Sequence, residues 1–291
     1  MLASASALEF EKLVEEDLGS VSVSVGDLIA ADSRDMAIKS WDFGPSSITE
    51  EAVAEMLKES YFPSSRVKIP PPGQTVPEPE EGYAVVFRDF FTCGLRLPYV
   101  PFLRRVLETF NVQVHHLTPM AFLTLSKFCW ACVSYGAEPD VDTFCAYYDL
   151  QKQPKKKKEV REGKEVEVTY QYGSCTFMSK RNQGVDRLEL SFCQKGKWDR
   201  GWLEQWFYVK TYGVRGTTED GAEVVEYPLT SRMEDMAPHT RVDPPEEKSP
   251  ARKACDRAFA AACRYSGGRD LVEEIMASNY WPLGKDNPAF R

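Results

Sequence analysis

The segment Thr118-Pro-Met-Ala-Phe-Leu-Thr-Leu-Ser-Lys-Phe-Cys-Trp-Ala-Cys-Val-Ser-Tyr-Gly136 decides the fold of the first half of this chain. Thr118 is a residue type that caps helix N-termini, and Pro119 stands at the first helical position, where its missing N–H costs no hydrogen bond. The residues that follow are apolar nearly all round, and Gly136 supplies a helix stop. A helix that is apolar on every side is typical of a domain centre, and we predict one here.

Shorter signals predict further elements on the N-terminal side of this helix. The segment 44–51 (Gly-Pro-Ser-Ser-Ile-Thr-Glu-Glu) is typical of a helix start, in which Ser47 or Thr49 can serve as the cap. Residues 84–87 (Ala-Val-Val-Phe) fit a short buried strand or the approach to a helix. Residues 101–110 begin with Pro and end before Asn111, which tolerates a left-handed stop, so we predict a helix there.

A third helix is predicted at residues 141–150, and together these helices give a helical core over about residues 100–150. After residue 150 the apolar period changes from helical spacing to the alternation of strands. Residues 166–172 alternate, and after a turn predicted at Gly173-Ser174 the chain returns through residues 175–178.

Later segments complete the prediction of an α+β fold. Residues 188–192 and 206–209 also alternate, so we expect an antiparallel β-rich segment over about residues 164–212. Residues 251–276 return to a helical pattern that breaks at Gly267-Gly268. This C-terminal helix either closes the domain or docks a partner, and the pattern favours closure.

The predicted boundaries divide the chain into three parts. Residues 1–40 read as an N-terminal helix followed by an extended segment, residues 41–284 as one domain, and residues 285–291 as a tail. Within the domain, residues 63–82 are rich in proline and poor in large apolar side chains. Such a segment is a tether without a core of its own.

The net charge of −8 conceals an asymmetry between the two halves of the chain. Residues 1–150 carry 11 Lys and Arg against 22 Asp and Glu, whereas residues 151–291 carry 25 against 22. Only the C-terminal half therefore offers a basic surface to a polyanion such as nucleic acid.

The composition also limits the cellular compartment. No stretch approaches the roughly 20 apolar residues of a membrane span, and the N-terminus lacks the basic start of a secretory signal. The 8 cysteines are scattered without a dense framework, which fits reduced thiols. We therefore expect an intracellular protein of the nucleus or the cytoplasm, without membrane contact.

Five landmarks in a fixed order carry a resemblance to a known family. They are residues 44–51; residues 81–87 with 94–98; residues 101–104 with 115–119; Trp202 with residues 206–209; and residues 278–284 (Ser-Asn-Tyr-Trp-Pro-Leu-Gly). In this order they resemble the gypsy-type transposon domain that long-terminal-repeat retroelements of plants encode, over roughly residues 41–284. The resemblance implies a retrotransposon origin and carries no reaction or catalytic residue with it.

The sequence lacks residues that define the active-site motifs of the enzymes that retroelements encode. Residues 147–150 (Tyr-Tyr-Asp-Leu) hold one carboxylate where a reverse transcriptase needs two adjacent ones for its metal pair. Residues 32–34 and 142–144 lack the glycine of an aspartic protease loop. No glycine-rich phosphate loop and no Gly-x-Ser-x-Gly elbow occurs. We therefore predict no catalytic residue, although 44 acidic residues leave a divergent arrangement of carboxylates open.

Two short motifs resemble parts of zinc sites. Cys129 and Cys132 have the first spacing of a zinc knuckle, but Ala137 occupies the histidine position. His115 and His116 are adjacent, so in a helix or strand they point in different directions. We interpret all four as packed side chains, and we predict no metal and no other cofactor.

The sharpest local feature is a basic run that follows Pro154 and comprises Lys155, Lys156, Lys157, Lys158 and Arg161. Three interpretations remain open. The run fits a solvated loop kept clear of the core, a nuclear-import signal, or a direct contact with the phosphates of a nucleic acid.

A second candidate interleaves cations with aromatic rings, as single-strand binders do when bases stack on side chains. It comprises Lys195, Lys197, Trp198, Arg200, Trp202 and Lys210. Trp198, Trp202 and Trp206 recur every four residues, which also suits a helical face packed on the core, and we favour packing.

These observations favour a retrotransposon-derived protein with a non-enzymatic structural or nucleic-acid-associated role. The partners we expect are nucleic acid, through the C-terminal half, and further copies of the chain in an assembly, without a small-molecule ligand. Two other functions stay open: a divergent metal-dependent DNA-processing transposase, and a domesticated protein-interaction module.

Overall fold

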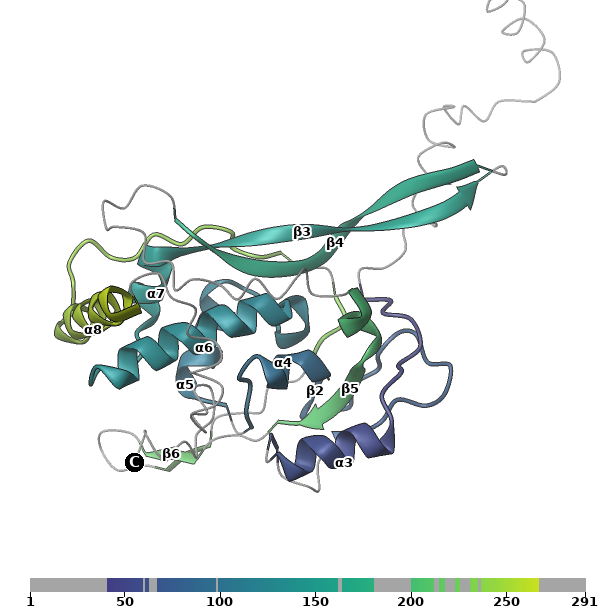
Figure 1. Ribbon diagram of the computed structural model, residues 1–291, viewed down its shortest axis with the longest axis horizontal. Coiled ribbons are helices and arrows are strands. Elements are labelled where there is room, and N and C mark those ends of the chain that lie inside the picture. Colours follow the sequence, from purple (N-terminus) through teal and green to yellow (C-terminus); the bar gives the residue numbers. More distant parts are fainter. Residues whose placement is uncertain are drawn as a thin grey trace, which may run out of the picture. The chain divides into compact units, whose positions relative to one another are not determined.

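The computed structural model describes residues 41–59, 61–62, 67–97, 99–161, 164–180, 200–211, 215–217, 223–225, 231–234 and 237–266. The chain divides into the units Met1–Ile38 and Lys39–Arg291, and every described residue belongs to the second. The elements expected within residues 1–40, the strand expected at 188–192 and the tail 285–291 lie outside the described residues. An α+β fold is confirmed (Figure 1).

Three consecutive helices form the helical core, as the sequence predicts. They are α5 (Pro101–Thr109), α6 (Pro119–Ser134) and α7 (Val141–Tyr147), with the 3-10 turn η1 (Val114–His116) before α6 (Figure 1). The hydroxyl oxygen of Thr118 accepts a hydrogen bond from the backbone N–H of Ala121, 3.2 Å away, which confirms the predicted N-cap. The left-handed φ angles of Asn111 (50°) and Gly136 (75°) confirm the predicted helix stops.

The third helix is shorter than the sequence predicts. It ends at Tyr147 because Tyr148 adopts extended backbone (φ −129°, ψ 140°) and begins strand β3 (Tyr148–Arg161). The expectation that this helix reaches Leu150 is therefore wrong. Residues 148–150 pair with β4 (Lys164–Ser179), which lies beyond the reach of a local helix signal.

Strands β3 and β4 form a long antiparallel hairpin, which we call the ribbon (Figure 1). The turn predicted at Gly173-Ser174 is wrong, because β4 continues through these residues. The register shifts there instead: Gln153 pairs with Ser174, whereas Lys155 pairs with Tyr170. Pro154 lies at this irregularity and has no N–H to donate to the ladder, and Gly173 lies in the irregular stretch of β4. Proline and glycine inside strands are typical of a β-bulge.

A three-stranded antiparallel sheet joins segments that are far apart in the sequence. Its order is β1 (Val67–Lys68), β5 (Trp206–Lys210), β2 (Tyr83–Phe87), with Phe87 paired to Trp206. The strand expected at residues 206–209 is thus confirmed, and of the two alternatives for residues 84–87 the structure shows the buried strand, which leads directly into α4. Residues 206–209 are all buried, so the sheet is covered on both faces.

The remaining elements, apart from the C-terminal helix, are short. Helix α3 (Glu50–Lys58) has Thr49 as its N-cap, and α4 (Arg88–Thr92) follows β2 directly. The 3-10 helix η2 (Arg200–Glu204) precedes β5, and β6 (Arg215–Thr217) pairs with β7 (Glu223–Val225).

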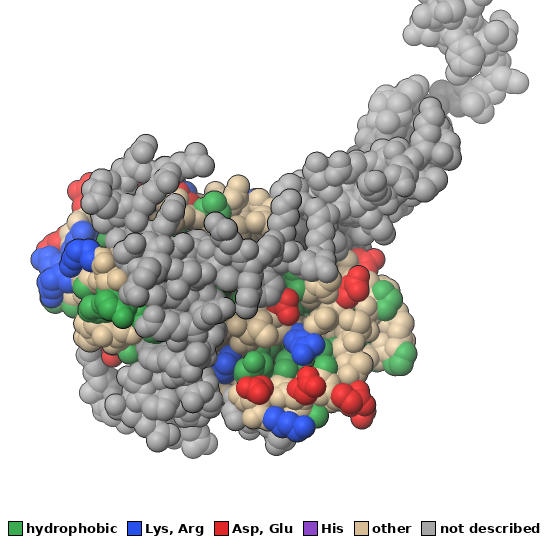
Figure 2. Space-filling model, in the orientation of Figure 1, with side chains coloured by type: hydrophobic (Ala, Val, Ile, Leu, Met, Phe, Trp, Pro, Cys, Tyr) green, Lys and Arg blue, Asp and Glu red, His purple; other side chains and the backbone are tan. Residues whose placement is uncertain are grey.

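Helix α8 (Pro250–Ser266) closes the helical core, as the sequence favours. Its buried face packs against α6 and comprises Cys255, Ala258, Phe259, Ala262 and Cys263. Its exposed positions include Lys253, Arg257 and Arg264, and Figure 2 shows basic side chains gathered over this helix. Among the described helices, none combines the length and apolar character needed to cross a membrane.

Candidate nucleic-acid interface

The base of the ribbon is fixed to the domain by buried and partly buried contacts. The side chain of Lys180, 7% exposed, lies 3.3 Å from Asp149 Oδ1 and donates a hydrogen bond to the carbonyl of Val242 (3.1 Å). The backbone N–H of Leu150 donates to the carbonyl of Thr240 at 2.9 Å. The ribbon therefore starts from a rigid base that joins β3 to the segment before α8.

The opposite strand is attached to the helical core. The backbone N–H of Thr118 donates to the carbonyl of Cys175 on β4 at 2.9 Å. Leu150 and Phe177 pair across the ribbon and are 2% and 3% exposed. One face of the ribbon base is thus part of the hydrophobic core.

The basic run lies in the outer half of strand β3. Lys155 to Lys158 occupy consecutive ladder positions opposite Tyr170, Thr169, Val168 and Glu167. Arg161 is the last residue of β3 and pairs with Lys164. The structure therefore places these residues in a hydrogen-bonded strand, whereas one of the three sequence interpretations placed them in a loop.

The pairing also identifies residues that sequence reasoning did not select. Lys164 and Tyr170 belong to β4 and lie directly across the ladder from Arg161 and Lys155. The alternation of residues 166–172 predicted a strand here. The register that makes them neighbours of the basic run depends on the bulge near Pro154, and the glycine of β4 was interpreted from the sequence as a turn instead.

The aromatic candidate lies in a different part of the fold. Trp202 belongs to η2, is 9% exposed, and packs its ring edge-on against Phe87 with centroids 4.7 Å apart. A buried ring offers no free face to a base, so its contacts are those of the packing interpretation. Arg200 is the first residue of η2, and Lys210 is exposed at the end of β5. Lys195, Lys197 and Trp198 lie outside the described residues.

Of the two adjacent histidines, His115 is buried and His116 is partly buried. Burial lowers the pKa of His115 well below its usual value, and that of His116 to about 4. His115 Nδ1 lies 3.2 Å from the hydroxyl of Ser231, and His116 Nδ1 accepts the backbone N–H of Gln113. In the part of the chain that the structure describes, no group of three or more His, Cys, Asp or Glu side chains is arranged to hold a metal ion.

The cysteine pair of the central helix meets a third cysteine on α8. The Sγ atoms of Cys132 and Cys255 lie 3.2 Å apart in the buried interface of α6 and α8. Burial raises the pKa of the Cys132 thiol, whereas the hydrogen bond shared with Cys132 lowers the pKa of Cys255. Cys129 is also fully buried, so these thiols serve as packing side chains.

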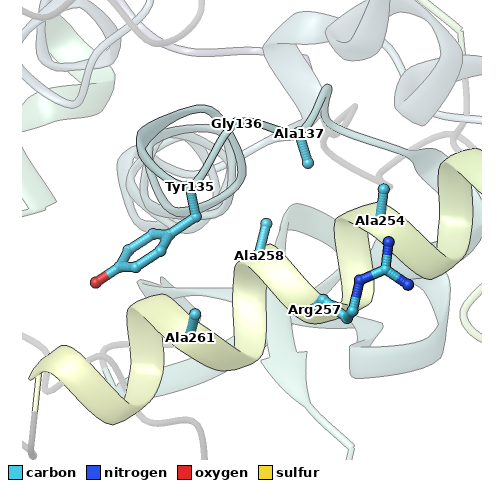
Figure 3. Close-up of a pocket in the computed structure, with 7 residues that line it drawn as sticks. All are labelled: Tyr135, Gly136, Ala137, Ala254, Arg257, Ala258 and Ala261. Atoms are coloured by element: carbon cyan, nitrogen blue, oxygen red, sulfur yellow. The ribbon is translucent and has the colours of Figure 1, made fainter.

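A shallow hollow lies between the end of α6 and the surface of α8. Figure 3 shows three alanines of α8 facing the turn that follows α6, beside the side chains of Tyr135 and Arg257. The lining comprises Tyr135, Gly136, Ala137, Ala254, Arg257, Ala258 and Ala261. Four of these residues are alanines, and the polar side chains are those of Tyr135 and Arg257.

Part of the chain, centred on the helical core, matches a known protein family. Residues 85–152 match the family described as "putative gypsy type transposon". This range includes α4, α5, α6, α7 and the first residues of β3. No curated protein and no solved structure matches the chain. The family match at residues 85–152 is to the same gypsy-type transposon family that the sequence resembles, and it supports a transposon-derived protein.

Proposed function

We propose that this protein is a non-enzymatic, nucleic-acid-associated structural protein of a gypsy-type element, and that the ribbon is its contact with nucleic acid. The observation that carries the proposal is the position of the basic run. Its residues are consecutive rungs of the outer half of the ribbon, which is built on a fixed base. A row of cationic residues along one strand is the kind of segment that binds a polyanion.

The geometry of a strand supports this proposal. Successive residues rise by about 3.3 Å, so Lys155 to Arg161 extend over roughly 20 Å. Along that length, nucleic-acid backbones present several phosphates, each with a counterion that a bound lysine or arginine releases. A strand therefore offers more simultaneous contacts than the same residues in an irregular loop.

Salt-dependent binding tests the proposal directly. Labelled duplex DNA, single-stranded DNA and RNA are titrated with the full chain by fluorescence anisotropy, between about 50 and 200 mM salt. We expect affinity to fall steeply with salt. Replacing Lys155 to Lys158 by alanine is expected to reduce the logarithmic slope by up to about 0.9 for each lost phosphate contact. Undetectable or salt-independent binding contradicts the proposal.

Two further measurements address the other functions that the sequence leaves open. Strand cleavage or joining that requires Mg²⁺ or Mn²⁺ would overturn the non-enzymatic role. Sedimentation over a range of protein concentrations tests the structural role, for which we expect growth into large particles. A strict monomer would contradict that role while leaving nucleic-acid binding intact.

A further inference from the structure

The register of the ribbon assigns each residue of its outer half to one of two faces. Residues directly opposite each other in an antiparallel pair share a face, and successive residues of one strand alternate between faces. The first face, which we call the basic face, holds the positions Lys155, Lys157, Glu159, Arg161, Lys164, Val166, Val168 and Tyr170. The second, which we call the neutral face, holds Lys156, Lys158, Val160, Glu165, Glu167 and Thr169.

The two faces differ in charge although they share one short stretch of sequence. The basic face holds four cations and one carboxylate, whereas the neutral face holds two cations and two carboxylates. Lys158 and Glu167 are directly opposite each other on the neutral face, where opposite charges stabilise a cross-strand pair. Along the sequence, glutamates follow the lysines closely and weaken any phosphate site. The register removes Glu165 and Glu167 from the face that carries most of the cations.

The shape of the ribbon selects among nucleic acids. The major groove of B-form DNA is about 12 Å wide and admits a two-stranded β-ribbon. The major groove of A-form RNA is too narrow for side chains to enter. Single strands are bound mainly by stacked aromatic rings, and the basic face has one aromatic position, Tyr170. Because the basic face has cationic positions on both strands, it could contact phosphates on both sides of such a groove.

We propose, resting on the nucleic-acid role above, that the ribbon binds duplex DNA through its basic face, with Lys155, Lys157, Arg161 and Lys164 as the phosphate contacts. The neutral face is directed away from the duplex. The four cations come from both strands of the hairpin, so correct pairing of β3 with β4 is a condition for binding.

Two double variants with identical composition test the face assignment. K155Q/K157Q removes two lysines from the basic face, and K156Q/K158Q removes two lysines from the neutral face of the same strand. In titrations of the full chain with labelled duplex DNA, we expect K155Q/K157Q to weaken binding about tenfold and to lower the salt slope by about 2. We expect K156Q/K158Q to stay within about twofold of the wild-type affinity.

A third variant tests the face assignment by replacing the glutamates of the neutral face. E165Q/E167Q removes two negative charges from the neutral face, and we expect duplex affinity to remain within about twofold of wild type. If only the net charge of the ribbon determined binding, whichever face carried it, this variant would bind DNA more tightly and both lysine variants would lose affinity equally. Circular dichroism and thermal unfolding confirm that all three variants keep the fold.

The outcomes separate the two proposals. Absence of salt-dependent binding by the wild-type chain to every nucleic acid contradicts the proposed function itself. Binding with equal losses in K155Q/K157Q and K156Q/K158Q leaves that function standing and overturns the face assignment. Tighter binding of single strands or of duplex RNA than of duplex DNA overturns the choice of the DNA groove. A selective loss in K155Q/K157Q on duplex DNA supports the inference.

Discussion

The ring of Phe177 on β4 meets the ring of Phe144 on α7 edge-on, with centroids 4.9 Å apart and an interplanar angle of 84°. This contact joins the ribbon to the helical core. Phe144 is fully buried and also contacts the rings of Phe102, Phe110, Phe128 and Tyr148. One side chain therefore connects three helices and both strands of the ribbon.

Replacing Phe144 by alanine is expected to destabilise the fold by about 3–5 kcal/mol, because the cavity removes contacts from five neighbouring rings at once. Urea unfolding followed by tryptophan fluorescence measures the change. Phe144→Leu keeps most of the volume and is expected to cost about 1–1.5 kcal/mol. A loss below about 1 kcal/mol in the alanine variant would show that the ribbon and the helices are not joined through this residue.

The N-cap of the central helix provides a second prediction. Thr118→Ala removes the oxygen that accepts from the N–H of Ala121, and we expect a loss of about 1 kcal/mol in the free energy of unfolding. Thr118→Ser retains that oxygen and is the matched control, expected within about 0.5 kcal/mol of wild type. Equal losses in both variants would point to the threonine methyl group rather than to the cap.

The lowered pKa values of His115 and His116 predict that stability depends on pH. Burial depresses the folded-state pKa of His116 from 6.5 to about 4 and also lowers that of His115. Below pH 6.5 the unfolded chain therefore binds protons that the folded chain excludes, so stability is present above that pH and is lost as the pH falls toward 4. For His116 alone the loss from about pH 7.5 to pH 5 is about 2 kcal/mol.

Urea unfolding at these two pH values measures the histidine effect. Carboxylates contribute to any acid-induced change, so the informative comparison is with His116→Gln, which cannot titrate in this range. We expect the difference in stability between the two pH values to shrink by about 2 kcal/mol in that variant. An unchanged pH dependence would mean that His116 is solvated in the folded protein.

Thiol reactivity tests the packing of the cysteines. The 7 described cysteines are all buried, and burial raises the pKa of Cys175 to about 11 and those of Cys145 and Cys263 to about 12. The thiolate is the reactive form, so these side chains react slowly with a disulfide reagent in the native state. Cys193 lies outside the described residues, so the test uses a Cys193→Ser variant. In this variant we expect little labelling by Ellman's reagent before unfolding and full labelling in guanidinium. Rapid native labelling would contradict the buried arrangement of α6 and α8.

Local signals in the sequence predicted several elements correctly. The Thr118-Pro119 start, the left-handed stops at Asn111 and Gly136, and the strand at residues 206–209 all follow from interactions within a few residues. Trp202 and Trp206 are buried, as the packing interpretation expects, but the helical face suggested by tryptophans four residues apart is wrong for Trp206, which lies in strand β5. Caps and periodicities of this kind leave a direct trace in the order of residues.

The errors arose where distant residues compete with a local signal. Residues 148–150 have a helical pattern, yet their pairing with residues 177–179 extends them. Gly173-Ser174 has the composition of a turn, yet pairing on both sides keeps it within β4. The hydrogen bonds of an already formed ladder outweigh a turn preference that amounts to about 1 kcal/mol or less.

The sequence by itself determined the central helix, its cap and its stop, the alternation of the strands and the position of the basic run, because each depends on neighbours along the chain. Tertiary structure decided which strands pair and in what register. It placed β5 between β1 and β2, brought the thiols of Cys132 and Cys255 into contact, and divided the positions of one lysine-rich stretch between two faces of the ribbon. Such pairings bring together residues that are distant in sequence, and their free energy depends on packing that no short window of sequence contains.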